Sequence, residues 1–181
     1  MSKSGIVTSI YSSYKDLKWS KLVLNIIGNA SSAILNMTAS ELFNDDRIFE
    51  IEIKAIKEIF AIMKRERIKA VNLPGFPVIW LKFAVEVLPA GILQNTLKKI
   101  FSEGRGQKDP SLSIDIKKCA GKSEIDFLNG VVYSHKGYYP ANKILTDIYS
   151  GIHEGSIPKE KYDKNPKNLY RYYTQELQNM P

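Results

Sequence analysis

The stretch Trp19–Asn36 reads WSKLVLNIIGNASSAILN and carries its polar side chains at helical intervals. Successive polar positions lie four, four, three and four residues apart, which places them along one face of a helix. These positions are Lys21, Asn25, Asn29, Ser32 and Asn36. Because the remaining positions are largely apolar, the pattern predicts one long buried helix from about Asp16 to Asn36.

The polar stripe on this helix differs from an ordinary solvated face. It carries amides and a hydroxyl around one lysine, whereas a wet face normally carries glutamates and lysines. Buried polar groups need hydrogen-bonding partners. Two interpretations follow: the stripe lines a polar cleft for a bound carboxylate or carbonyl, or its members bond to neighbouring helices.

Helical periodicity continues through the rest of the chain, and strand-like alternation is scarce. A second long helix is predicted from Asp45 or Asp46 to about Arg67, and NLPGFP at Asn72–Pro77 is a clear break. Further helices are predicted at residues 78–87, 92–101, 112–119, 123–135, 140–151 and 166–177. We therefore predict an all-α fold, with a linker-like segment at 1–15, a helical domain at 16–155 and a helical tail at 156–181.

Charge and cysteine content restrict the function classes. The net charge of +7 permits an anionic partner, but it also fits a solvated basic surface. Cys119 is the only cysteine and no Cys/His cluster is present, so we expect no internal disulfide and no metal site. The apolar stretch Val78–Leu93 is too short and too often interrupted to span a membrane. These features predict a cytoplasmic protein.

Two later segments give the first helix a context. Asp109–Gly130 reads DPSLSIDIKKCAGKSEIDFLNG, and Pro140–Leu145 reads PANKIL. With the first helix they resemble, in the same order, the W-x-K-L, S-[ML]-x-x-D … [ST]-E-[IV]-D-x-[LI]-N-G and P-x-N-x-x-L motifs of ketopantoate reductases (2-dehydropantoate 2-reductases). The resemblance runs from about Gly5 to Ile152 and is to the C-terminal helical domain of that family, which is of the 6-phosphogluconate dehydrogenase type.

The resemblance implies roles for the residues that match these motifs. Lys21 corresponds to the general acid that protonates the carbonyl oxygen of a 2-keto acid as hydride reaches its carbon. Glu124 corresponds to an active-site carboxylate that engages substrate and lysine. Asn25 and Asn29 correspond to amides that position the lysine and the substrate. Ser111 corresponds to a serine that binds the substrate carboxylate.

Other matches carry less chemistry. Asp115 matches a recurrent acid of structural role, and Ser32 and Asn36 are candidate supporting residues. Where some members of the family carry a further substrate-binding asparagine, this chain has Ala39. That difference weakens the case for ketopantoate itself as the substrate.

The resemblance also implies a cofactor, NADPH, for which we find no binding motif in this sequence. The N-terminal Rossmann domain of the family opens with a strand and a G-x-G-x-x-[GA] turn. The G-x-G at Gly104–Gly106 follows no apolar strand and has Asp109 in place of the third glycine, so we reject it as a dinucleotide site. We therefore expect NADPH to bind only through a Rossmann partner chain or a missing N-terminal half, and not tightly to this chain alone. The bare interdomain face is expected to find such a partner or a second copy of the chain.

The basic, aromatic tail is the remaining candidate for a function. Its segment KYDKNPKNLYRYY, Lys161–Tyr173, mixes residues in a way that RNA-binding surfaces also do. We expect instead that Tyr170, Tyr173 and Leu177 pack against the body, and we do not expect nucleic-acid binding. The isolated His135 and His153 are predicted to lie at the surface or at helix ends.

Three hypotheses remain after these observations. The first is an oxidoreductase module for a small 2-keto acid, active with NADPH only when a Rossmann domain completes it. The second is a non-catalytic helical module that keeps the cleft and serves in binding or dimerisation. The third, a basic nucleic-acid binder, would show a steep dependence of affinity on salt.

Overall fold

The computed structural model describes residues 10–104, 111–118 and 123–179. Cys119 and Asp109 therefore lie outside the described residues, as does most of the rejected G-x-G segment. The described residues form helices and no named strand, with one isolated bridge between Leu73 and Phe76. The predicted all-α fold is confirmed.

The helices differ widely in length. The longer ones are α1 (Tyr14–Ile26), α4 (Asp46–Arg65), α5 (Val78–Val87), α6 (Ala90–Gly104), α9 (Pro140–His153) and α10 (Pro166–Asn179). The shorter ones are α2 (Asn29–Leu35), α3 (Ala39–Asn44), α7 (Ser111–Lys118) and α8 (Asn129–Tyr133), with 3-10 turns η2 (Glu124–Phe127) and η3 (Lys159–Lys161).

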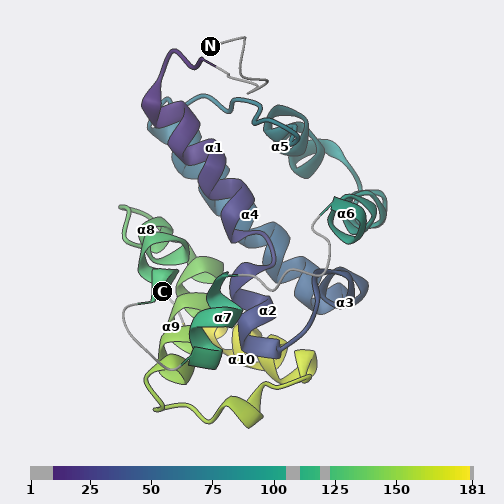
Figure 1. Cartoon of the computed structure of the whole chain (residues 1–181), viewed down its shortest axis with the longest axis vertical. Helices are drawn as coiled ribbons and strands as arrows, with labels where there is room; N and C mark the ends of the chain where they lie inside the picture. The colour runs from purple at the N-terminus through teal and green to yellow at the C-terminus, as the bar shows by residue number, and fades with distance from the viewer. Residues whose placement is uncertain (1–9, 105–110, 119–122, 180–181) are drawn as a thin grey trace, which may run out of the picture.

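The long helix α4 is the central element of the fold. Its N-cap Asp45 accepts hydrogen bonds from the backbone N–H groups of Arg47 and Ile48, at 3.0 and 3.4 Å, and basic residues occupy its last turn. It contacts α1, α3, α5, α8, α9 and α10. In Figure 1, α1 and α4 run together through the middle of the molecule, with α5 and α6 on one side and α7 to α10 gathered at the lower end.

The start of α9 is held by a buried carboxylate of α4. The side chain of Glu58, 4 % exposed, accepts hydrogen bonds from the backbone N–H groups of Ala141 and Asn142 at 2.9 and 3.0 Å. The amide of Asn142 donates a further bond to the same carboxylate, at 2.7 Å. Burial raises the pKa of Glu58 above its ordinary value, although these hydrogen bonds oppose the rise. Pro140 suits the first turn because it has no N–H to satisfy.

Two of the predicted helices are wrong as continuous elements. The helix predicted for Asp16–Asn36 ends at Ile26 and restarts as α2, because Gly28 between them takes a left-handed conformation with φ of 66°. The helix predicted for residues 123–135 is divided into η2 and α8 at Leu128, whose φ and ψ of −104° and −99° are not helical. The helix α3, with a capping box of Thr38 and Glu41, was not predicted.

The C-terminal tail packs on the body as predicted. Leu169 and Tyr173 on α10 are fully buried, and Tyr170, Tyr172 and Leu177 are partly buried against the same core. The helix α10 contacts both α4 and α9. Among the described residues, no helix combines the length and the apolar character that a membrane span requires.

The left-handed residue between α1 and α2 gives a test of the fold with an internal control. Gly28→Ala should lower the free energy of unfolding by about 1–2 kcal/mol, because a side chain is strained at this φ although its Cβ would meet only Leu42 Cδ1, at 3.6 Å. Gly91→Ala in α6 adds a Cβ that meets nothing within 4 Å and should be neutral or stabilising by up to about 1 kcal/mol. Urea unfolding of both variants measures the difference, and equal effects would contradict the proposed origin of the break.

Candidate functional site

The helix α1 carries Lys21 and Asn25 on an exposed face, one turn apart. The opposite face is buried through Leu22, Val23 and Ile26. The helix starts at a Ser13 N-cap, whose hydroxyl accepts the N–H of Asp16 at 3.3 Å. Neither an ion pair nor a side-chain hydrogen bond joins Lys21 to another described residue. Its ammonium group is thus open to solvent.

A second buried carboxylate of α4 fixes the break between α1 and α2. Glu52, 2 % exposed, accepts the backbone N–H of Gly28 at 2.7 Å and the hydroxyl of Ser31 at 2.6 Å. Charge-assisted hydrogen bonds of this kind are stronger than neutral ones. The carboxylate thereby determines where α2 begins and which way its first residue points.

That first residue, Asn29, joins three segments. Its amide donates to the backbone carbonyl of Asn25 at 3.1 Å and to the hydroxyl of Ser111 at 3.3 Å. The side-chain oxygen Oδ1 of Asn29 accepts the backbone N–H of Leu112 at 3.3 Å. The last turn of α1, the start of α2 and the start of α7 therefore meet at one buried asparagine, and two predicted site residues 82 positions apart are in contact.

The chain of contacts continues to Tyr149 on α9. The Tyr149 hydroxyl donates to the carbonyl of Leu112 at 3.1 Å. Burial raises the pKa of Tyr149, and the negative charges of Asp115 and Glu124 raise it further, whereas a hydrogen bond with Ser123 lowers it. Both acids therefore lie within electrostatic reach of this hydroxyl. Sequence reasoning missed Tyr149, because its position in an apolar helix face gives no sign of a polar role.

The remaining predicted site residues take no part in the contacts around Asn29. Glu124 is exposed at the start of η2, and no hydrogen bond or ion pair between described residues joins it to Lys21. Ser32 is buried, and its hydroxyl has no hydrogen-bond partner among the described residues. Asn36 is exposed and forms the left-handed C-cap of α2 with φ of 50°, a position that asparagine tolerates well.

The two histidines pack against aromatic rings. His135 meets Trp19 edge to face with 5.1 Å between ring centroids, and His153, in the last turn of α9, stacks on Tyr149 at 6.0 Å. Neither belongs to a group that could hold a metal, since no three His, Cys, Asp or Glu side chains of the described residues gather in such a way.

Comparison with known proteins identifies the family. The sequence matches the family model described as the ketopantoate reductase PanE/ApbA C-terminal domain over residues 13–152. The chain belongs to this family. No curated protein matches it significantly.

A solved structure of the PanE/ApbA family shows the same fold. It is a PanE/ApbA family ketopantoate reductase from Ralstonia eutropha JMP134, with a TM-score of 0.64 and 21% sequence identity. The alignment covers 85% of this chain and 46% of that one, so this chain matches less than half of the length of its neighbour. The segment that carries α10 follows the residues matched by the family model.

Two adjacent serines of α2 test the role of Glu52. Ser31→Ala should lower the free energy of unfolding by about 1.5–3 kcal/mol, because it removes a buried hydrogen bond to a carboxylate. Ser32→Ala should change it by less than about 0.5 kcal/mol, or raise it, because the lost hydroxyl has no partner among the described residues. Chemical denaturation of the two variants provides the comparison. Equal losses of unfolding free energy would show that the hydrogen bond from Ser31 to Glu52 adds no stability of its own.

Proposed function

We propose that this chain is the substrate-side helical domain of a ketopantoate-reductase-like oxidoreductase that reduces a small 2-keto acid. The observation that carries the proposal is the contact between Asn29 and Ser111, at 3.3 Å. It joins two segments that separately resemble the family's substrate motifs, and both lie within the residues that match the family model.

Reduction of a ketone to an alcohol requires hydride at the carbon and a proton at the oxygen. In this proposal Lys21 donates the proton, since its ammonium group is exposed and has no partner among the described residues. Ser111, also exposed, donates a hydrogen bond to the substrate carboxylate, and Asn29 fixes the orientation of that hydroxyl. Glu124 is proposed to approach Lys21 and the substrate when the site is assembled.

The described residues do not fit a complete dinucleotide site. The pyrophosphate of such a cofactor is normally held by a strand, a glycine-rich turn and a helix N-terminus. The described part of the chain contains only an isolated bridge in place of strands. When bound by another domain, NADPH would supply the hydride. We therefore propose that a Rossmann domain, from a partner chain or from a longer form of this protein, completes the enzyme.

An exposed apolar face supports the proposed need for a partner. Ile79, Phe83 and Val87 follow one another at intervals of four on α5, and each is more than half exposed. Ile92 in α6 is 56 % exposed. Apolar patches of this kind mark interaction sites on many proteins. The Rossmann domain is the occupant we propose.

The proposed general acid can be tested in the assembled enzyme. Lys21→Ala should lower kcat at least about 10²-fold, because a positioned proton donor is lost. Lys18→Ala, an exposed lysine one turn earlier on α1, should leave kcat nearly unchanged. Ser111→Ala should mainly raise KM, since its contact exists in both ground and transition states. Steady-state kinetics measures all three, and normal turnover in Lys21→Ala would refute the assignment.

A second test uses the purified chain without any partner. It should show no enzyme-like oxidation of NADPH with ketopantoate or related 2-keto acids, because nothing in the described residues holds the nicotinamide ring about 3–3.5 Å from the carbonyl carbon. Absorbance of NADPH follows the reaction. Turnover that disappears in Lys21→Ala would reveal a cofactor site within this chain. If addition of a Rossmann domain restores no activity either, the non-catalytic binding or dimerisation module becomes the better hypothesis.

A further inference from the structure

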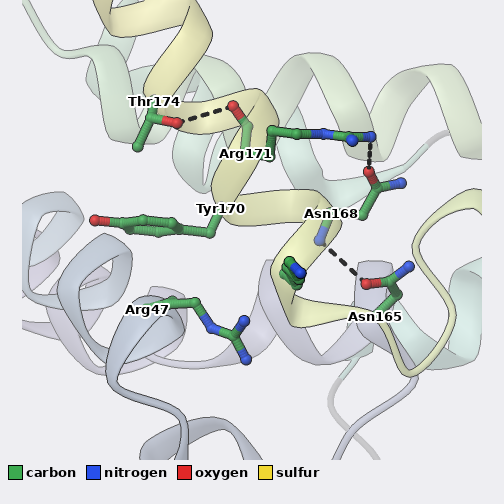
Figure 2. A pocket seen from close by; sticks show the side chains of 7 residues that line it. Arg47, Asn165, Asn168, Tyr170, Arg171 and Thr174 are labelled. Atoms are coloured by element: carbon green, nitrogen blue, oxygen red, sulfur yellow. Dashed lines mark hydrogen bonds between the residues drawn. The ribbon is translucent and has the colours of Figure 1, made fainter.

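A pocket lies between α10 and the first turn of α4 (Figure 2). Its volume of about 750 Å³ is within the range of pockets that hold small molecules. Except for Arg47, every lining residue belongs to the segment from Asn165 to Thr174, which follows the family-matched residues. None of the candidate catalytic residues lines it.

The lining of this pocket is positively charged. It contains Arg47, Lys167 and Arg171, and no acidic residue. The charge of Arg47 is balanced by Asp45, which accepts hydrogen bonds from its guanidinium group at 2.5 and 3.0 Å. Lys167 and Arg171 take part in no ion pair between described residues. Lys167 and Arg171 would therefore attract a bound anion, although the carboxylate of Glu50 lies beside Tyr170 at the same pocket.

The side chains of Arg171 and Tyr170 favour an anion that also carries a planar ring. The Arg171 guanidinium uses Nη2 to bond Asn168 at 2.6 Å, which leaves its other N–H groups available for a planar or tetrahedral oxyanion. The hydroxyl of Tyr170 already donates to Glu50 at 2.8 Å, so the ring is what Tyr170 offers to a ligand. Figure 2 shows this ring above the side chain of Arg47, at the side of the pocket. Aromatic rings stack on planar groups such as nucleobases.

We propose that this pocket binds a phosphate ester of mononucleotide size, with its phosphate groups at Lys167, Arg171 and Arg47 and its planar ring against Tyr170. The charge supplies the attraction for phosphate, and the volume and the ring distinguish such an ester from free phosphate. The site is independent of the proposed reductase function, because it uses none of the same residues.

Calorimetric titration of the full chain with ADP, pyrophosphate and adenosine tests the proposal. ADP should bind with a Kd below about 1 mM, more tightly than pyrophosphate, and adenosine should bind far more weakly than ADP. Affinity for ADP should fall with rising salt. No binding of ADP at this level, or equal affinity for ADP and adenosine, would overturn the proposal.

Variants locate the binding. Lys167→Gln with Arg171→Gln should weaken ADP binding at least about 10-fold, whereas Lys15→Gln with Lys18→Gln, which removes the same charge from exposed sites on α1, should not. Tyr170→Leu should weaken ADP but not pyrophosphate. Circular dichroism checks that each variant is folded. Equal loss of ADP affinity in both double variants would show that ADP binds through general surface charge, which would overturn the proposal. If a 12-nucleotide RNA binds more tightly than ADP through the same residues, the pocket is instead part of a nucleic-acid surface.

Discussion

The carboxylates of Glu52 and Glu58, both buried on α4, accept hydrogen bonds from the first residues of α2 and α9. A carboxylate buried without partners is strongly destabilising, and the first N–H groups of a helix have no acceptor within that helix. The carboxylate gains its hydrogen-bond donors, and the start of the helix gains its acceptor, only when α4 and the partner helix are both in place. One helix thereby sets the starting points and directions of two others, and the core packs around that frame.

The position of α2 has a direct effect on the candidate site. Because Glu52 holds Gly28 and Ser31, the intervening Asn29 is directed at the start of α7 rather than along a continuous face of α1. Lys21 and Asn25 remain on the exposed face of α1, and Asn29 turns inward. The polar stripe is thus divided between an accessible part and a structural part. The interpretation that stripe residues bond to neighbouring elements describes Asn29, whereas a ligand cleft at Lys21 and Asn25 stays a prediction.

The sequence predicted the long helices well, because α4, α5, α9 and α10 have clear periodicity, an N-cap or a first-turn proline. It did not predict the break at Gly28, since the apolar pattern runs through it and the carboxylate that bonds the left-handed Gly28 lies 24 residues away. Family motifs suggested that Asn29 and Ser111 belong to one site, and the structure places them in contact. Tyr149 could not be found, because an aromatic residue at a core position normally only packs. The approach of Glu124 to Lys21 stays a prediction.

The two carboxylates of α4 also differ in how far along the sequence their hydrogen-bond partners lie. Glu52 bonds residues 24 and 21 positions away, whereas the backbone partners of Glu58 are 83 and 84 positions away. Closing a longer loop costs more entropy. During synthesis, α1 to α4 can assemble around a satisfied Glu52 while Glu58 still depends on water. The backbone hydrogen bonds to Glu58 can form only after the ribosome has delivered Ala141 and Asn142.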